Sequence, residues 1–304
     1  MRALTNLLFF PSGFFLIVLA LAFAWADRKL IARFQNRIGP RWFQTVADIL
    51  KLLIKEEILP ATAQPTLFRG LPLLAMSGVL TAALYVPLLG FTAALSFNGD
   101  LIVTLYLLSL LTLCIGMAGW NSTSRFTMMG ATRALTQMFS YEAPFMLALL
   151  GPAVVAGSWQ INSIVTANHS AWILLSQPFG FVVALIGLMG KLEMPPFDAP
   201  KAKEEIVGGA LTEYSGRGLG LFHLAKEMEL VVGLTLIAAL YMGGLANPLE
   251  FFAKTLILLV ILCSLHCVLT RLRIDQTVGL WWRYGALVVL LQWLALIAWK
   301  GIVA

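Results

Sequence analysis

The sequence has few charged residues and few of the side chains that bind metals. Charged residues make up 12% of the 304 positions, against about 25% in a typical soluble domain, while hydrophobic residues make up 60%. Only three cysteines and three histidines are present. The cysteines are too scattered for a disulfide framework or an iron–sulfur motif. These shortages exclude an ordinary soluble enzyme, a disordered chain and a secreted disulfide scaffold.

Motifs for cofactor binding or covalent catalysis are also missing from the sequence. It contains no Walker A loop, no dinucleotide fingerprint and no nucleophile–histidine–acid signature. Cys263, His266 and Cys267 share one face of an expected helix, but a structural zinc site needs four ligands, so a packed apolar face is favoured. We therefore expect no metal site, no cofactor bound by this chain and no redox centre of its own.

Long apolar runs dominate what the sequence does contain. Its mean hydropathy is +0.86, and about 20 apolar residues form a helix long enough to cross a bilayer. These runs predict an all-α polytopic membrane protein with a single domain, residues 1–304. The roughly eight predicted transmembrane helices cover about 6–26, 68–91, 101–120, 136–157, 172–190, 228–245, 251–270 and 280–301.

The distribution of basic residues predicts the orientation of these helices. Eighteen of the 21 Lys and Arg residues fall in or beside one set of alternating loops. Cytoplasmic loops carry the excess of Lys and Arg in membrane proteins, so we predict that both termini lie outside. The two long cytoplasmic loops are then about 27–67 and 191–227. The net charge of +6 follows from this topology and does not indicate nucleic-acid binding.

The first long loop contains an amphipathic pattern. Apolar residues from Trp42 to Ile54 recur at helical spacing, and Gln44, Asp48, Lys51 and Lys55 form the opposite face. Such a helix lies along the membrane surface or docks a partner, and the pattern leaves both interpretations open. The basic residues that precede it either anchor the chain at the membrane or have a docking role.

The second long loop is rich in acidic residues, unlike a loop that only sets the orientation. Residues 191–229 hold seven acidic and five basic side chains. Pro195-Pro196 and Pro200 impose extended backbone, while several glycines allow close approach. We therefore expect a folded polar structure at the membrane edge.

Four carboxylates are expected within or beside the predicted helices. Asp27, Glu193 and Glu229 fit either a proton relay or simple interfacial charge. For Glu142 the relay is favoured, because we expect this residue to lie deepest in the membrane. Burial raises the pKa of a carboxyl and basic neighbours lower it, so such groups can exchange protons near neutral pH.

At this point several motifs resemble the core membrane subunit 1 family of respiratory complex I. They follow one another in order over most of the chain and lie in the predicted cytoplasmic loops. The motifs are Asp27-Arg28-Lys29 with Arg33, Gln35, Arg37, Gly39 and Pro40; Ala47-Asp48, Lys51-Leu52 and Lys55-Glu56; Ser140-Tyr141-Glu142; Pro196-Phe197-Asp198 with Pro200; Glu213-Tyr214-Ser215-Gly216; and Arg271, Arg273, Asp275 and Gln276.

Departures from the quinone-reducing branch indicate a particular relative. That branch typically has Glu at the position of Asp27 and acids at the positions of Lys191, Lys201 and Lys203. The chain is therefore most similar to the membrane-anchor subunit of energy-converting, membrane-bound nickel–iron hydrogenases and related sulfane-reductase-like complexes. The departures also argue against a bound quinone.

The resemblance implies a subunit that anchors a peripheral arm and couples electron transfer, from ferredoxin in this branch, to proton or sodium translocation. It implies partners that include hydrogenase-like large and small subunits, iron–sulfur subunits, antiporter-like membrane subunits and the lipid bilayer of the cell membrane. Iron–sulfur clusters and a nickel–iron centre would belong to those partners. The implied relay residues are Asp27, Glu142, Glu193, Asp198, Glu204, Glu205, Glu213 and Glu229. The implied docking or pKa-tuning residues are Arg28, Lys29, Arg33, Arg37, Lys191, Tyr214, Arg217, Arg271, Arg273 and Asp275.

Three other functions remain as alternatives. The chain could form the quinone site of an NADH- or ferredoxin-quinone oxidoreductase, or serve as an inert scaffold for a soluble arm. A self-contained secondary transporter would place its site at the bilayer midplane on broken helices. Here the ionisable residues gather toward the cytoplasmic edge instead.

Overall fold

The computed structural model describes residues 9–167 and 172–303, and this part of the chain is helical without any strand. The predicted all-α class is therefore confirmed. The longer helices are α2 (Gly13–Phe34), α3 (Gln44–Ile54), α4 (Pro65–Tyr85), α5 (Asp100–Asn121), α6 (Arg125–Ala156), α9 (Pro178–Lys191), α11 (Gly216–Tyr241), α12 (Pro248–Val268) and α14 (Ala286–Val303). The shorter elements are α7 (Ile161–Ala167), α8 (Ile173–Ser176), η1 (Ala199–Lys201), α10 (Lys203–Ile206), η2 (Gly209–Leu211), α13 (Ile274–Leu280) and η3 (Trp281–Gly285).

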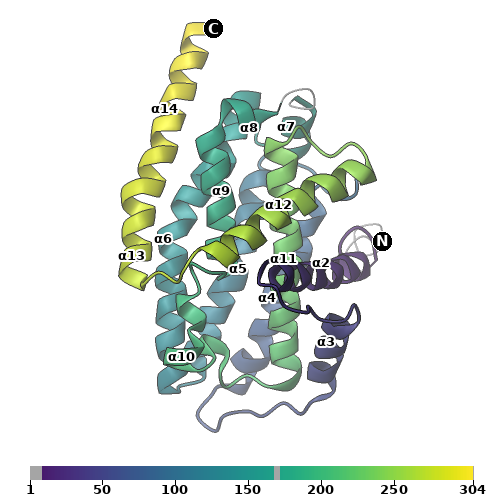
Figure 1. The fold of residues 1–304 in the computed structure, drawn as a ribbon, viewed down its shortest axis with the longest axis vertical. Helices are drawn as coiled ribbons and strands as arrows, with labels where there is room; N and C mark the ends of the chain where they lie inside the picture. Colours follow the sequence, from purple (N-terminus) through teal and green to yellow (C-terminus); the bar gives the residue numbers. More distant parts are fainter. Residues whose placement is uncertain (1–8, 168–171, 304) are drawn as a thin grey trace.

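An upright bundle of α4, α5, α6, α9 and α11 forms the body of the molecule (Figure 1). Helix α11 packs against α2, α3, α4, α9 and α12. Every residue of α11 from Met228 to Tyr241 is buried. A helix that is apolar on all faces belongs in a core, so α11 is the centre around which the others assemble.

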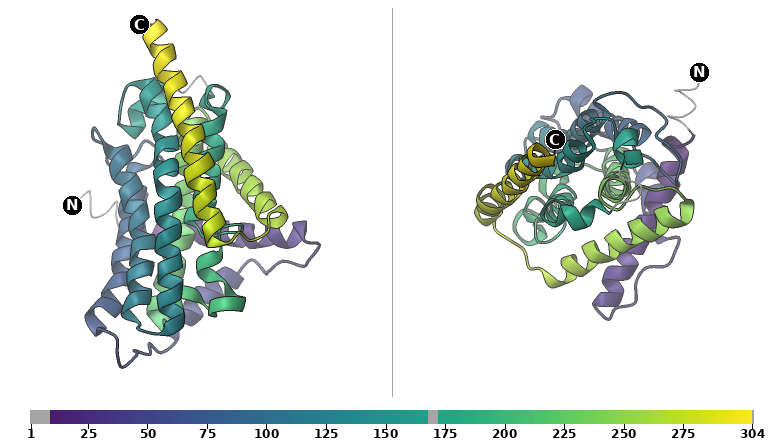
Figure 2. Two further views of the ribbon diagram at one scale, coloured as in Figure 1. Left: turned by 90° about the vertical axis from the view of Figure 1, so that its left-hand side faces the viewer. Right: turned by 90° about the horizontal axis from the view of Figure 1, so that it is seen from above.

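Three other helices lie around this bundle. Helices α2 and α12 are strongly inclined to the upright helices and pack against each other and against α11 (Figures 1 and 2). Helix α14 lies along α6 and α9 and projects beyond the end of the bundle (Figure 2). Several of its large apolar side chains, including Leu291 and Leu294, are more than half exposed, as expected of a surface that faces lipid.

Five helices are long and apolar enough to cross a membrane: Pro65–Tyr85, Asp100–Asn121, Arg125–Ala156, Pro248–Val268 and Ile274–Ala298. The other predicted spans also fall on helices, but α9 has only 14 residues, and α2 and α11 carry several charged side chains. Residues 6–8 of the first predicted span lie outside the described residues. Helix α6 begins at Arg125 and α13 at Ile274, earlier than predicted, because polar residues extend both helices beyond their apolar runs.

The segment between α9 and α11, residues 192–215, folds back against the bundle and is called the long loop below. Its η2 turn packs on α5 and α6 where both helices present glycine. A Cβ atom on Gly130 would lie 2.3 Å from the backbone nitrogen of Ala210, closer than any real contact. The loop is therefore seated by backbone contact, which confirms the prediction that it is folded.

The amphipathic pattern in the first long loop does form a helix, α3. It packs against α2 and α11, and Leu52 lies beside Gly220 of α11. Val46, Leu50 and Ile54 of its apolar face are 40%, 52% and 84% exposed. The chain itself does not cover these side chains, which suits a helix lying on a membrane or under a partner.

Candidate functional site

Five charged side chains converge where α9, α11 and the long loop meet, and we call them the buried charge cluster. Lys226 of α11 forms an ion pair with Glu193, and Lys201 Nζ lies 3.3 Å from Glu193 Oε2. Beside them, Lys191 Nζ lies 3.7 Å from Glu229 Oε1. The side chains of Glu193, Lys191 and Glu229 are 4%, 2% and 1% exposed. Three bases and two acids therefore meet here, and of the five only Lys201 reaches far into solvent.

Local structure explains why these side chains meet. Lys226 and Glu229 are three residues apart on α11, so they project from neighbouring positions on one face of the helix. Lys191 is the last residue of α9, and Glu193 follows with a left-handed backbone (φ +50°). A non-glycine residue in this region is uncommon and concentrates at functional sites. The turn at Glu193 directs its carboxylate back toward α11.

The charge state of Glu193 follows from competing effects. Burial raises the pKa of its carboxyl, but the nearby ammonium groups of Lys226 and Lys201 outweigh burial and lower the pKa to about 2. Glu193 is therefore ionised at neutral pH. It can carry a proton only when one of these two lysines moves away or loses its own charge.

Several buried polar atoms around the cluster have no hydrogen-bond partner in the described part of the chain. They include both carboxylate oxygens of Glu229 and the hydroxyl of Tyr141. Buried polar groups in folded proteins are nearly always hydrogen-bonded, so these atoms are suited to receive water or a transferred proton. Tyr141 interacts electrostatically with Glu229, Glu193 and Glu142, and so extends the cluster toward α6.

A second group of charges lies on the other side of α11, in a cavity of about 200 Å³ bounded by α2, α3 and α11. Arg28 Nη1 lies 3.0 Å from Asp48 Oδ2, and Arg28 Nη2 lies 3.9 Å from Glu227 Oε1. His223 lines the same cavity. Close by on α2, Asp27 Oδ1 accepts a hydrogen bond from the thiol of Cys263, with an Oδ1–Sγ distance of 3.2 Å.

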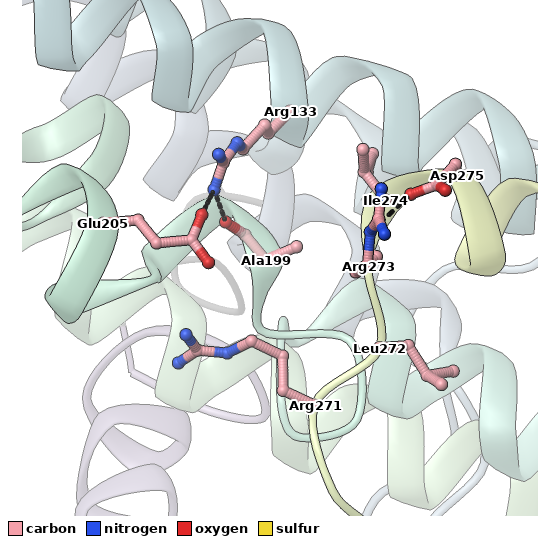
Figure 3. A pocket seen from close by; sticks show the side chains of 8 residues that line it. All are labelled: Arg133, Ala199, Glu205, Arg271, Leu272, Arg273, Ile274 and Asp275. Atoms are coloured by element: carbon pink, nitrogen blue, oxygen red, sulfur yellow. Dashed lines mark hydrogen bonds and ion pairs between the residues drawn. The ribbon is translucent and has the colours of Figure 1, made fainter.

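A third group forms a surface pocket of about 380 Å³ beside the start of α13 (Figure 3). Arg133 Nη1 lies 2.5 Å from Glu205 Oε2 and donates to the carbonyl of Ala199. Arg271 holds Asp198 with two hydrogen bonds, from Nε at 2.8 Å and from Nη2 at 2.7 Å. These pairs join α6, the long loop and the α12–α13 connection.

The structure distributes the predicted site residues over these three groups and the surface. The buried charge cluster contains Lys191, Glu193 and Glu229, the α2–α3–α11 cavity contains Arg28 with Asp27 close by, and the surface pocket contains Asp198, Glu205, Arg271, Arg273 and Asp275. Lys29, Glu142 and Glu213 are half-buried, whereas Arg33, Arg37, Glu204 and Arg217 are exposed. Tyr214 is buried and stacks on Phe68 with ring centroids 3.9 Å apart.

Two predicted placements differ from the structure. Glu142 is half-buried on the flank of α6, whereas Glu229 is fully buried, so Glu142 is not the most enclosed carboxylate. The reason is that α6 begins well before the predicted span and presents Tyr141, not Glu142, to the core. Asp27 lies inside α2, which continues to Phe34, and does not end a helix.

The sequence prediction misses several members of these groups. It does not single out Lys226, Lys201, Arg133 and His223, although each contacts or lines one of them. A signal is available for Lys226, because a lysine three residues before Glu229 in an apolar helix requires a partner. Among the described residues, no group of three or more His, Cys, Asp or Glu side chains is arranged to hold a metal ion.

Comparison with known proteins places this site in a family. The sequence model of the family described as NADH dehydrogenase matches residues 7–298, nearly the whole chain. The chain belongs to this family. Its similarity to individual family members extends over most of both chains.

Three relatives illustrate this similarity, and each is named as a subunit of NADH-quinone oxidoreductase. The protein of Dehalococcoides mccartyi (strain CBDB1) is 36% identical over 281 residues, which cover 89% of this chain and 79% of the relative. That of Geobacillus sp. (strain WCH70) is 34% identical over 303 residues, covering 92% and 90%. That of Methylococcus capsulatus (strain ATCC 33009 / NCIMB 11132 / Bath) is 31% identical over 279 residues, covering 88% of each.

Proposed function

We propose that this chain is a multi-pass membrane subunit of a complex I-like, redox-driven ion pump. In this proposal it anchors a peripheral electron-transfer arm and passes protonation changes sideways to neighbouring antiporter-like subunits. The observation that carries the proposal is the buried charge cluster, in which two carboxylates and three lysines meet at the edge of an apolar bundle. Ionisable groups in such positions are costly and usually functional.

A continuous array of ionisable groups supports a relay role. Glu227 interacts electrostatically with Arg28, Asp27 and Lys226, which links the α2–α3–α11 cavity to the cluster. Within the cluster, Glu193 and Glu229 both influence Tyr141, and Tyr141 is also influenced by Glu142. A change of charge at the cavity can therefore alter the proton affinity of groups that lead to the flank of α6.

The end of the molecule that carries the long loop and α3 is suited to hold the peripheral arm. We assign this end to the cytoplasm, because it carries most of the basic residues. The exposed arginines Arg33, Arg37 and Arg217 would contact the arm, together with the uncovered apolar face of α3. Iron–sulfur clusters, and a nickel–iron centre where present, would be held by the partner subunits.

Two features favour a hydrogenase-like branch that takes electrons from ferredoxin. Lys191 and Lys201, at positions where the quinone-reducing branch typically has acids, belong to the cluster. The α2–α3–α11 cavity, at about 200 Å³, is smaller than the roughly 300–1,000 Å³ of typical ligand pockets. It does not fit a quinone in this form, and we derive no step through one. The relatives' shared name favours the second candidate, a quinone-site subunit.

The relay is tested in the complete complex, purified through a tag on this chain. We expect Glu142→Gln, and the charge-balanced double variant K191Q/E229Q, to assemble and to transfer electrons but to lose ion pumping. The control is Glu250→Gln, because Glu250 lies at the start of α12 near Lys254, away from the cluster. Unchanged pumping in both relay variants would instead support an inert scaffold.

The same purified complex decides the electron-transfer branch. Mass spectrometry of the co-purifying chains and a metal assay are sufficient. Nickel together with a hydrogenase large subunit would establish the hydrogenase-like branch. Iron without nickel, with NADH-oxidising subunits and quinone reduction, would establish the quinone-site subunit.

A further inference from the structure

A small cavity of about 20 Å³ lies directly against Glu193. Its walls are polar on one side, where Glu193, Lys201 and Gly208 lie, and apolar on the other, where Ile115 and Ala134 lie. A polar cavity needs roughly 10–15 Å³ to accept one water molecule. This cavity therefore has room for a single water in contact with the carboxylate of the buried charge cluster.

Lys201 connects this cavity to solvent. Its Nζ lies 3.3 Å from Glu193 Oε2, yet its side chain is 39% exposed, whereas that of Glu193 is 4% exposed. The backbone around it is fixed, because a Cβ on Gly209 would lie 2.1 Å from the carbonyl oxygen of Pro200. Only the long side chain of Lys201 can move between the carboxylate and water without disturbing the packing of the loop.

The other charged and titratable groups that act on Glu193 do not have this freedom. Lys226 and Glu229 project from α11 and Lys191 ends α9, and their side chains are 14%, 1% and 2% exposed. Tyr141 of α6 is also buried. Of the two lysines paired with Glu193, Lys201 is therefore the one that solvent can reach. Its departure would leave a buried carboxylate with a single cation, which raises the pKa of that carboxyl.

We propose that Lys201 gates proton uptake by Glu193 from the aqueous phase on the long-loop side, through the one-water cavity. With Lys201 on Glu193, the carboxylate stays ionised and closed to protons. When Lys201 swings into solvent, a hydronium ion in the cavity gives its proton to a Glu193 oxygen and remains as water. The return of Lys201 expels the proton again. The inference rests on the proposed function, because Glu193 is useful as an acceptor only within a relay.

The gate is tested by infrared titration of the complete complex, with the Glu193 carboxyl band assigned by its loss in E193Q. In K201Q, we expect Glu193 to protonate at a pH about 1–3 units higher than in the wild type, because one opposite charge has been removed. The matched control is K203Q, since Lys203 is an exposed lysine two residues away on α10. A K201Q titration identical to that of the wild type would overturn the proposal.

The route is tested separately by filling the cavity. Ala134 is 1% exposed and lines the cavity, so Ala134→Val adds two methyl groups where the water would sit. We expect the A134V midpoint to match the wild type, while protonation of Glu193 after a pH jump becomes slower. An unchanged rate would exclude the cavity as the route. If A134V does not assemble, the K201Q titration alone decides the role of Lys201.

These outcomes are distinguishable from failure of the proposed function. Loss of pumping in Glu142→Gln, with an unshifted K201Q titration, would keep the relay and remove the gate. A shifted K201Q titration, with pumping intact in Glu142→Gln and in K191Q/E229Q, would keep the gate on Glu193 and remove the relay.

Discussion

Lys191 and Glu229 face each other across the contact between α9 and α11, with 3.7 Å between Lys191 Nζ and Glu229 Oε1 and with both side chains at most 2% exposed. Removing one partner of a buried ion pair leaves an uncompensated charge, whereas removing both is often neutral. The single variant K191Q should therefore destabilise the protein by about 3–5 kcal/mol. The double variant K191Q/E229Q should recover most of this loss. Thermal unfolding in detergent measures both, and equal losses would contradict a mutual pair.

The Arg271–Asp198 pair makes a prediction about the long loop. Its two hydrogen bonds match the planar fork of an arginine, which a lysine cannot reproduce. Because Arg271 is 34% exposed, we expect Arg271→Lys to cost only about 1 kcal/mol. The loss should appear as faster amide hydrogen exchange in residues 192–201. Arg273→Lys is the control, because Arg273 is 79% exposed. Equal exchange in both variants would show that charge alone is sufficient.

The contact between α6 and η2 makes a prediction about assembly. A methyl group on Gly130 would meet the backbone of Ala210 at 2.3 Å and of Gly209 at 2.5 Å, and neither can give way as a flexible side chain could. We expect Gly130→Ala to displace the long loop and to cost several kcal/mol, as overpacking of a tight interface does. Gly70→Ala is the control, because nothing lies within 4 Å of the added atom. Proteolysis of the long loop and recovery of the complex would measure the effect.

Much of the fold could be predicted from the sequence, because apolar runs and the amphipathic pattern of α3 depend on local residue order. Helix ends were less predictable. Polar residues such as Arg125 and Ile274–Gln276 continue helices past their apolar runs, guided by contacts that only the folded chain makes. For the same reason, the prediction placed Glu142 too deep.

The candidate site was predictable only in part. Individual carboxylates stand out in an apolar sequence, so Glu193 and Glu229 could be named in advance. Their lysine partners depend on the turn at Glu193 and on how the long loop folds back, and neither follows from spacing alone. The pairing of Lys226 and Lys201 with one carboxylate therefore required the structure.

The stability of the long loop should depend on pH through Glu193. Its pKa is about 2 in the folded protein and 4.5 without its neighbours, so the ionised carboxylate stabilises the fold above about pH 4.5. This contribution is lost as the pH falls from about 4.5 to about 2. We expect amide protection in residues 192–215, corrected for intrinsic exchange, to stay constant from pH 7 to 5 and to fall below that. E193Q should remove this acid dependence, and protection that persists unchanged in the wild type to pH 3 would show that the two lysines do not stabilise the carboxylate.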